Sequence, residues 1–386
     1  MQAVVLGAGL MGRAIAFDLI HHCSFNTVTL ADKSPQALSE AEAVIDNSHL
    51  KILLVDIDNS AQIKTIIQSA DVLISAVPYF YNLQLTKQCI EMGCHFIDLG
   101  GNNTVVEKQR NLYDKAKKNQ VTVIADSGLA PGLVSVITRD IIEKSDTVES
   151  VRLRVGGLPV HPQPPLNYEL VFSANGLINE YVEPALVLEQ GKIVEKPSMT
   201  EIETLKFPDP FGEMEAFITS GGSSTLPYTY QDKIQYLDYK TIRYPGHCEK
   251  MKTLLDLGFG STESTAVNSV KVVPKQVLIT LLKKHLPSSQ QDVVLLRVKS
   301  NVKKKNALFE LTYELIDYFE KKTGFTAMMR TTGFPVSITA DFIARNVITN
   351  HGVFCPEEII PPQPFFDELR KRNIDITIIE RNLNEE

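Results

Sequence analysis

The feature that most constrains the fold of this chain is the segment GAGLMG at residues 7–12, which follows the apolar run QAVVL and precedes the helical pattern RAIAFDLIHH. Gly7, Gly9 and Gly12 have the GxGxxG spacing. In that spacing the first glycine makes a tight strand-to-helix turn, the second lets the backbone approach a pyrophosphate, and the third allows the helix to pack on the strand. A glycine-rich turn alone is weak evidence, so its context matters.

The context is a second predicted strand, TVTLAD, which ends at Asp32, about 20 residues after the last glycine. An acidic side chain there can accept hydrogen bonds from both ribose hydroxyls of the adenosine and repels a 2′-phosphate. This favours NAD over NADP, although Lys33 beside it leaves NADP open. Asp32 could instead cap the next helix. We expect the cofactor to contact Asp32, the three glycines and, at the helix N-terminus, Leu10 and Met11.

Apolar runs then alternate with helical patterns as far as residue 126. Continuous apolar runs are typical of strands buried on both faces, so the pattern predicts a six-stranded, doubly wound parallel sheet of the Rossmann type. Ligands of such sheets bind beyond the carboxyl ends of the strands. Each residue there could be an ordinary loop residue, but their shared position makes them candidates: Asp56 and Ile57 near the adenine, Ala76, Val77 and Pro78 near the nicotinamide ribose, and Gly100, Gly101 and Asn102 near the reacting end.

The chain has 386 residues, which is more than one hydrophobic core usually organises, so the rest of the sequence predicts a second domain. Pro131 suits the first turn of a helix. From about residue 148 several segments alternate with period two, which predicts an α+β domain with a mixed or antiparallel sheet and a hairpin tip at 303–306. An amphipathic helix ends near Gly352. We therefore predict an α/β chain with an NAD-binding domain at 1–128, a substrate and dimerisation domain at 129–334, and a segment 335–386 that returns to the first domain.

Composition excludes several other classes of function. The net charge is −7, and no large Lys/Arg cluster is present, which argues against nucleic-acid binding. No stretch of about 18 apolar residues predicts a membrane span. The five cysteines lack metal-binding or redox spacing. The first strand begins at residue 2, which leaves no room for a cleavable signal. We expect a cytoplasmic protein without a metal site.

Several longer segments resemble the saccharopine dehydrogenase-like oxidoreductases, and within them the lysine 6-dehydrogenases. The resemblance covers nearly the whole chain, and its middle segments are more specific than the nucleotide fingerprint. The segments are VVLGAGLMG, IDLGG (97–101), DSGLAPGL (126–133), VGGLPVHPQPPLNYELVFS (155–173), EAFITSGGSSTL (215–226), YKTIRYPGH (239–247) and GVFCPEEI.

The resemblance implies NAD-linked oxidation of the ε-amine carbon of L-lysine. The resulting imine would hydrolyse to 2-aminoadipate 6-semialdehyde and ammonia, and the aldehyde would cyclise to piperideine-6-carboxylate. In the saccharopine-forming branch, substrate touches positions that correspond here to Gly101, Asn102, Ala130, Ser220, Gly221 and Thr241–Arg243; we place Ala130 among the cofactor contacts. That branch carries an arginine where this chain has TSGGSS and an aspartate at Ala130, so lysine alone fits better. We also expect the protein to form a homodimer or homotetramer.

Within YKTIRYPGH, Arg243 offers a planar fork for the substrate carboxylate, and Thr241 lies on the same face of a predicted strand. Lys240 and Tyr244 would point to the opposite face. The alternative is a polar strand that faces solvent.

Hydride loss from an amine carbon requires a neutral amine, and lysine has a reference pKa of about 10.4. His247, Asp126 and Tyr168 are candidate proton acceptors, and the sequence does not choose among them. Each could instead be structural, His247 by capping a turn, Asp126 by orienting backbone and Tyr168 by packing.

Two other functions remain open from the sequence. One is a saccharopine or carboxynorspermidine dehydrogenase, which acts on a secondary amine. The other is a non-catalytic NAD-binding regulator.

Overall fold

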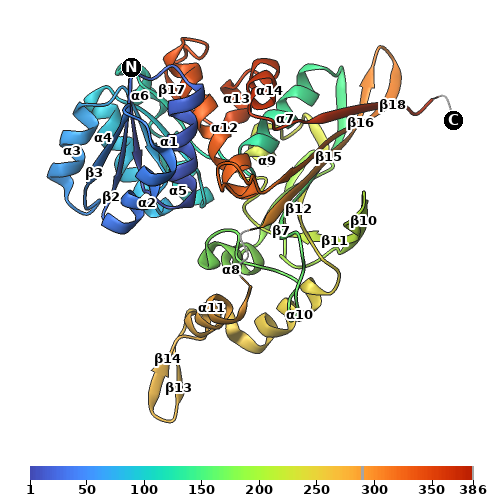
Figure 1. Ribbon diagram of the computed structural model, residues 1–386. Helices are drawn as coiled ribbons and strands as arrows, with labels where there is room; N and C mark the ends of the chain where they lie inside the picture. Colours follow the sequence, from blue (N-terminus) through green and yellow to red (C-terminus); the bar gives the residue numbers. More distant parts are fainter. Residues whose placement is uncertain (288–290, 385–386) are drawn as a thin grey trace. The chain divides into compact units, whose positions relative to one another are not determined.

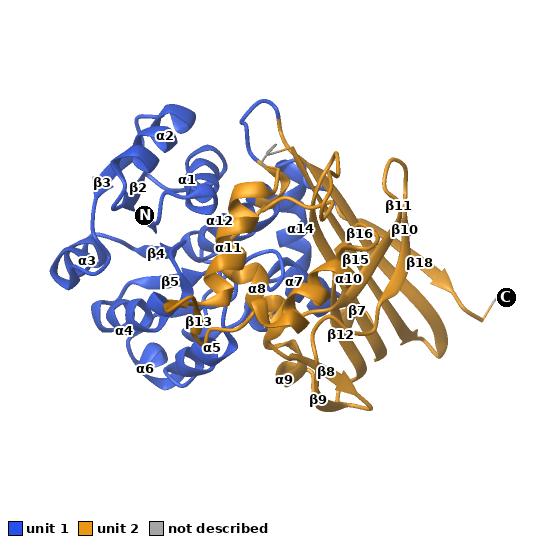
Figure 2. Cartoon of the chain, turned by 90° about the horizontal axis from the view of Figure 1, so that it is seen from below, with its two compact units in different colours: residues 1–140, 321–325, 329–375 blue, residues 141–320, 326–328, 376–386 orange. Residues whose placement is uncertain are grey.

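A computed structural model describes residues 1–287 and 291–384 (Figure 1). The chain divides into two compact units (Figure 2). Unit 1 comprises residues 1–140, 321–325 and 329–375, and unit 2 comprises the described residues of 141–320, 326–328 and 376–386.

Unit 1 is built on a fully parallel sheet (Figure 1). Among the described residues, seven strands form it in the order β17-β6-β5-β4-β1-β2-β3. The strands are β1 (Gln2–Leu6), β2 (Thr27–Asp32), β3 (Leu50–Leu54), β4 (Val72–Ser75), β5 (His95–Asp98), β6 (Thr122–Ile124) and β17 (Gly352–Phe354). The predicted doubly wound parallel fold is confirmed. The chain reverses direction across the sheet between β1 and β4, which is where such folds bind their ligands.

Helices connect the parallel strands, as crossover connections require. Between β1 and β6 they are α1 (Leu10–His22), α2 (Pro35–Ile45), α3 (Ser60–Gln68), η1 (Tyr79–Tyr81), α4 (Asn82–Met92), α5 (Asn103–Arg110) and α6 (Tyr113–Lys118). Of the remaining helices, α7 (Leu133–Glu143) follows β6, α12 (Ala327–Ala344) precedes β17, and α13 (Pro356–Ile359) and α14 (Pro362–Lys371) follow β17.

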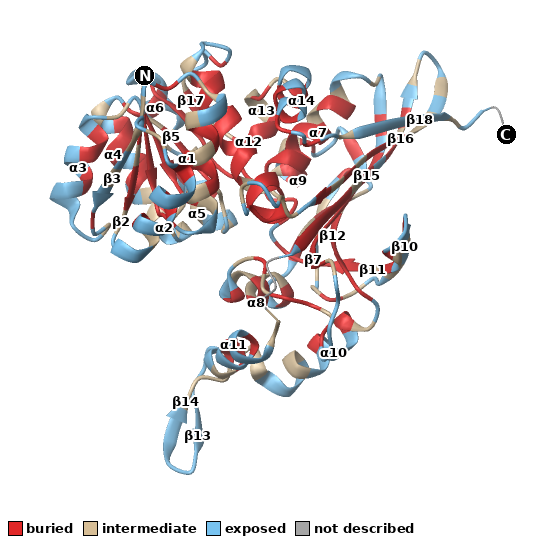
Figure 3. Cartoon of the chain, in the orientation of Figure 1, coloured by how far each residue is buried: buried red, intermediate tan, exposed pale blue. Residues whose placement is uncertain are grey.

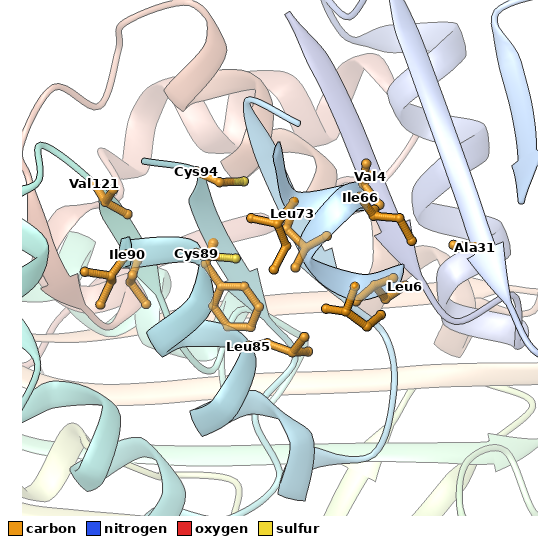
Figure 4. Close-up of a cluster of buried hydrophobic side chains, with 14 of the residues drawn as sticks. Val4, Leu6, Ala31, Ile66, Leu73, Leu85, Cys89, Ile90, Cys94 and Val121 are labelled. Carbon is orange, nitrogen blue, oxygen red and sulfur yellow. The ribbon is translucent and has the colours of Figure 1, made fainter. Parts of the chain in front are cut away.

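The strands of this sheet are buried, as their apolar runs predict (Figure 3). Val4, Leu6 and Leu73 from β1 and β4 pack with Leu85, which comes from α4, in one continuous apolar cluster (Figure 4). The edge strand β3 is the exception, since Leu54 is 59% exposed. β3 lies at an edge of the sheet and pairs with β2.

The C-terminal part of unit 1 differs from the sequence prediction. The long helix α12 ends at Ala344 and not near Gly352, where a seventh strand, β17, begins and pairs with β6. Three residues give too short an apolar run to be recognised beside a helix. Pro131 does not start a helix: it lies in a loop, and α7 begins at Leu133.

A buried ion pair fixes the returning segment within unit 1. The Nε of Arg372, directly after α14, donates to both carboxylate oxygens of Asp18 in α1 at 2.8 Å. The guanidinium also donates from Nη1 to Glu368 at 2.9 Å. The side chains of Arg372 and Asp18 are 1% and 0% exposed.

Unit 2 is built on a mixed sheet, as predicted. Nine strands, all within the described residues, form it; seven run in the order β10-β11-β12-β7-β15-β16-β18, while β8 pairs with β12 and β9. β12 and β7 are parallel, and the other pairs are antiparallel. The strands are β7 (Thr147–Pro159), β8 (Ala185–Glu189), β9 (Lys192–Lys196), β10 (Glu203–Phe207), β11 (Gly212–Ile218), β12 (Ile234–Arg243), β15 (Asp292–Lys304), β16 (Ala307–Tyr318) and β18 (Thr377–Asn382).

The other elements of unit 2 are α8 (Ala174–Val182), α9 (Leu226–Thr229), α10 (His247–Leu254), η2 (Leu255–Phe259), α11 (Pro274–His285) and the separate hairpin β13 (Thr265–Val267) and β14 (Val270–Val272). The predicted tip at 303–306 is the turn between β15 and β16. Lys305 and Asn306 both have positive φ there, as a two-residue hairpin turn requires.

The predicted domain limits differ from the two units. Unit 1 extends to Asp140 instead of residue 128, and the chain re-enters it before residue 335. The end of the predicted tail is also placed differently, because β18 pairs with β16 in unit 2. Residues 288–290 of the predicted second domain and 385–386 of the predicted tail lie outside the described residues.

Candidate functional site

The three glycines of the glycine-rich turn in unit 1 differ in what an added side chain would meet. Two of them leave no space for a side chain, and the third faces open space. A Cβ on Gly7, whose φ is +99°, would lie 2.6 Å from the Ala76 carbonyl oxygen. A Cβ on Gly12 would lie 1.7 Å from the Gly7 carbonyl oxygen. A Cβ on Gly9 would meet nothing within 4 Å. Gly7 and Gly12 are therefore needed by the fold, whereas the absence of a side chain at Gly9 leaves room for a ligand.

The open space at Gly9 coincides with the start of α1. Gly9 is the N-cap residue of this 13-residue helix, and it supplies no side-chain cap. The first N–H groups of a helix have no partner within the helix and carry a partial positive charge. Leu10, the first helical residue, is 44% exposed. This turn and the N-terminus of α1, with Leu10 and Met11, therefore fit the pyrophosphate of a dinucleotide.

Asp32 at the end of β2 is half-buried and braces this turn. Its carboxylate accepts hydrogen bonds from the backbone N–H of Ala8 at 2.7 Å and of Ser34 at 2.8 Å. Ser34, not Asp32, caps α2, because its hydroxyl accepts from the Ala37 N–H at 3.2 Å. Each carboxylate oxygen can accept a second hydrogen bond, so Asp32 can still receive ribose hydroxyls.

The other predicted cofactor residues lie at the same edge of the sheet, where the carboxyl ends of β3, β4 and β5 meet. Ala76 continues β4, and its N–H donates to the Leu6 carbonyl at 2.8 Å. Val77 is half-buried and Pro78 is exposed. Beyond β3, Asp56 is exposed and Ile57 is half-buried. No contact in the structure assigns these residues to a particular part of a dinucleotide.

The loop after β5 is organised by Asp98, a residue that the sequence analysis missed. Its buried carboxylate accepts from the Gly100 N–H at 2.8 Å and from the Gln109 side chain at 2.7 Å, and burial raises its pKa. Gly100 has φ +75°, and a Cβ there would lie 1.9 Å from the Asp126 carboxylate. The signal was available, because an aspartate two residues before a Gly-Gly pair is well placed to bind the backbone of that loop.

Several predicted residues around this loop have structural contacts. Asn102 caps α5, since its side-chain oxygen accepts from the Val105 N–H at 3.1 Å. Gly101 is exposed, with φ +115°. Asp126 is buried and has φ +60°, a backbone conformation that is unusual for a non-glycine residue. Ala130 is half-buried in the loop before α7.

In unit 2 the structure brings Tyr168, Arg243 and His247 together. Arg243, the last residue of β12, is 2% exposed. Its Nε donates to the Tyr181 hydroxyl and its Nη1 to the Ile242 carbonyl, both at 2.8 Å, and its guanidinium carbon lies 4.8 Å from the centre of the Tyr168 ring. Among the described residues, Arg243 has no carboxylate within 4.0 Å. This is a buried cation without an ion-pair partner.

Tyr181 and His247 continue a hydrogen-bond chain from Arg243. His247 Nδ1 lies 3.1 Å from the Leu166 carbonyl and therefore carries the proton, so Nε2 accepts from the Tyr181 hydroxyl at 3.0 Å. Burial, with the nearby Arg243 cation, lowers the pKa of His247 to about 3. Both ring nitrogens are engaged within the protein. This arrangement argues against His247 as the proton acceptor and makes it a residue that positions Tyr181.

The Tyr168 hydroxyl is buried and has no hydrogen-bond partner among the described residues. Burial raises its pKa to about 12, so Tyr168 is a neutral phenol at physiological pH and not a base. An unpaired buried hydroxyl costs about 1–3 kcal/mol. A ligand that accepts its hydrogen bond would recover part of that energy.

Polar side chains lie on both faces of strand β12, because successive residues of a strand point to opposite faces of the sheet. Thr241 is buried on the same face as Arg243, and its hydroxyl donates weakly to the Val155 carbonyl at 3.4 Å. Lys240 lies on the opposite face, where its Nζ is 3.3 Å from Glu203. The predicted separation of these faces is confirmed.

Helix α8 supplies a carboxylate that the sequence analysis missed. Glu180 precedes Tyr181 on α8, and its pKa is raised to about 7 by burial, an effect that Arg243 opposes. Ser220 holds this end of the helix: its N–H donates to the Glu180 carbonyl at 3.0 Å and its hydroxyl lies 3.5 Å from the Asn179 carbonyl. Gly221 is exposed. The Arg243 cation is thus influenced by one carboxylate, that of Glu180, and by the phenol groups of Tyr168 and Tyr181.

Across residues 1–287 and 291–384, no three His, Cys, Asp or Glu side chains are grouped so as to hold a metal ion. In the same part of the chain, no helix has both the length and the apolar character that a bilayer crossing needs.

Comparisons with known proteins agree with this architecture. The family model "Saccharopine dehydrogenase NADP binding domain" matches residues 3–124, and "Saccharopine dehydrogenase C-terminal domain" matches residues 128–375. The saccharopine dehydrogenase [NADP(+), L-glutamate-forming] of Schizosaccharomyces pombe is 23% identical, with 96% of this chain and 97% of that protein aligned. The corresponding enzyme of Saccharomyces cerevisiae is 22% identical over the same shares of the two chains.

A solved structure shows the same fold. The apo saccharopine dehydrogenase (L-Glu forming) from Saccharomyces cerevisiae superposes with a TM-score of 0.79, at 20% sequence identity, over 98% of this chain and 99% of that chain. Because the C-terminal family model alone spans more than half of the sequence, this chain belongs to the saccharopine dehydrogenase family.

Proposed function

We propose that this protein is an NAD-linked amino-acid dehydrogenase that oxidises the ε-amine carbon of L-lysine. The products would be 2-aminoadipate 6-semialdehyde, which cyclises, and ammonia. Arg243 carries the proposal: among the described residues its buried guanidinium has no carboxylate partner and the nearby Tyr168 hydroxyl is unpaired, which fits the carboxylate of an amino acid.

Unit 1 supports a dinucleotide cofactor. The space at Gly9 and the N-terminus of α1 would hold its pyrophosphate, and Asp32 would hold its ribose. The bound nicotinamide ring would accept the hydride. The carboxylate of Asp32 would repel a 2′-phosphate, which favours NAD here even though the named relatives use NADP.

The residues of unit 2 would orient the substrate. Arg243 would bind the carboxylate through its planar fork, while Tyr181, fixed by His247, keeps the guanidinium in place. The ε-amine must lose a proton before the adjacent carbon can lose hydride. Its reference pKa is about 10.4, so we expect turnover to increase from pH 7 towards alkaline pH.

The test is NADH formation at 340 nm with the purified protein, NAD and one amine at a time: L-lysine, L-ornithine, cadaverine or saccharopine. We expect activity with lysine. Activity with saccharopine alone would instead identify a secondary-amine dehydrogenase, as the names of the relatives suggest. NADH binding without turnover of any amine would identify a non-catalytic NAD-binding protein.

A matched pair of variants tests the carboxylate site. Arg243→Lys removes the planar fork and should raise the lysine KM by about tenfold or more, since a hydrogen bond to a charged group contributes about 1.5–3 kcal/mol. Arg297→Lys is the control, because Arg297 in β15 of the same sheet already pairs with Glu314 at 2.5 Å. An unchanged KM in Arg243→Lys would show that the fork binds no substrate.

A further inference from the structure

Glu180 is a carboxylate that the proposed chemistry has not yet used. It lies in α8, directly before Tyr181, whose hydroxyl accepts a hydrogen bond from Arg243 at 2.8 Å. Within the part of the chain that the structure describes, its carboxylate accepts no hydrogen bond and has no cation within 4.0 Å. The neighbouring side chains of α8 are occupied: Asn179 accepts from Lys275, and Tyr181 bonds to Arg243 and His247.

Glu180 and Arg243 influence each other without forming an ion pair. The guanidinium opposes the rise in the pKa of Glu180, and the Glu180 carboxylate in turn raises the pKa of Arg243. Burial alone would lower the pKa of Arg243, but Tyr181, Tyr168 and Glu180 raise it. Glu180 and Arg243 are thus two opposite charges in the same part of unit 2, and neither has an ion-pair partner among the described residues.

A free α-amino acid carries two opposite charges on one carbon atom, a carboxylate and an ammonium group. A ligand whose carboxylate is bound by Arg243 must place its α-ammonium group within a few ångströms of that carboxylate, whereas the ε-amine of an extended lysine lies several bonds further away. On the basis of the function proposed above, we propose that Glu180 binds the α-ammonium group of the substrate while Arg243 binds its α-carboxylate. The site then selects free α-amino acids over simple diamines and N-substituted amino acids.

The environment of Glu180 suits this role. The charged groups that act on it are Arg243 from β12 and Glu183 from the end of its own helix, and its pKa of about 7 reflects burial. Tyr168, Tyr181 and Tyr239 are the phenols that its charge affects. An ammonium group bound beside Glu180 stabilises the ionised carboxylate and lowers that pKa. Lysine binding near pH 7 should therefore release a proton from Glu180.

Calorimetric titration with two ligands distinguishes binding of the α-ammonium group from binding of the α-carboxylate. L-Lysine carries both, whereas 6-aminohexanoate has the same carboxylate and terminal amine but lacks the α-amino group. We expect Glu180→Gln to weaken lysine binding by about tenfold or more and 6-aminohexanoate binding by less than about twofold, because only lysine loses a charge-assisted hydrogen bond. Glu183→Gln, which removes an exposed carboxylate at the end of the same helix, should change neither.

The outcomes distinguish this inference from the proposed reaction. Equal weakening of both ligands by Glu180→Gln, or unchanged lysine binding, would overturn the role of Glu180. A fall in kcat with the lysine KM unchanged would also overturn it, since it would identify Glu180 as the base. If Glu180→Gln weakens the binding of lysine but not of 6-aminohexanoate, and the wild-type protein forms no NADH, the result would support the role of Glu180 in binding. It would overturn only the proposed reaction.

A measurement on the wild-type protein covers the case in which the variant does not fold. Titration at pH 7 in two buffers of different ionisation enthalpy gives the number of protons released on binding. We expect lysine to release more protons than 6-aminohexanoate does, because only lysine presents an ammonium group to Glu180. Equal proton release by the two ligands would overturn the inference.

Discussion

Replacement of Gly9 by alanine should weaken cofactor binding without weakening the fold. The added Cβ meets nothing within 4 Å, and the φ and ψ of Gly9, −66° and −172°, are allowed for alanine. A compatible Gly→Ala change stabilises a protein by about 0.4–1 kcal/mol, because it restricts the unfolded chain. The free energy of unfolding should therefore stay constant or increase slightly.

Cofactor affinity should change in the opposite direction. The methyl group would occupy the space that we assign to the pyrophosphate, and would lengthen or break a hydrogen bond from the helix N-terminus to a charged oxygen. Such a bond contributes about 1.5–3 kcal/mol, so the Kd for NADH should rise by roughly tenfold to a hundredfold.

Two assays test both parts of this prediction. Urea denaturation gives the free energy of unfolding, and a fluorescence titration with NADH gives the Kd; the chain contains no tryptophan to interfere. Gly12→Ala is the contrasting variant, since its Cβ would lie 1.7 Å from the Gly7 carbonyl oxygen and should destabilise unit 1. If Gly9→Ala binds NADH as tightly as the wild type, the pyrophosphate does not lie over Gly9 and our assignment of the turn is wrong.

Three other variants give independent tests. Asp32→Asn keeps one acceptor for the Ala8 N–H but removes the charge, so NAD affinity should fall while NADP affinity rises or stays constant in parallel titrations; equal losses for both would refute the ribose assignment. Asp18→Ala removes one of the two carboxylates that the buried Arg372 guanidinium contacts and leaves Glu368 as the other, so it should lower the free energy of unfolding by about 3 kcal/mol in urea, against less than about 1 kcal/mol for Glu40→Ala at a more exposed pair; similar losses would contradict this reasoning. Tyr168→Phe removes an unpaired buried hydroxyl, so thermal unfolding should show equal or higher stability while the lysine KM rises; a loss of stability would reveal a partner for that hydroxyl.

The first sheet could be predicted from sequence because its signals are local. The glycine spacing, the apolar runs and the acidic end of β2 each depend on a few adjacent residues. Strands β17 and β18 could not be predicted in the same way: β17 has three residues, and the polar segment of β18 becomes a strand only because β16 provides a partner. Their pairing is a tertiary effect that sequence periodicity does not record.

The same distinction applies to the candidate site. Arg243 was predicted because its segment is unusually polar, but its hydrogen bonds to a tyrosine in α8 depend on how that helix packs on the sheet. Glu180 was missed for this reason, since a carboxylate near the end of a helix is normally solvated. His247 was considered a base because histidine titrates near neutral pH, and burial removes that property.

The most direct test of the proposed reaction follows a deuterium atom from substrate to cofactor. The purified protein is incubated with NAD and either [6,6-²H₂]lysine or [2-²H]lysine, and the reduced cofactor is analysed by mass spectrometry. Oxidation at the ε-carbon predicts deuterium in the reduced cofactor from the first substrate and none from the second. Deuterium from the 2-labelled substrate, or reduced cofactor without deuterium from the 6-labelled one, would contradict hydride transfer from the ε-carbon.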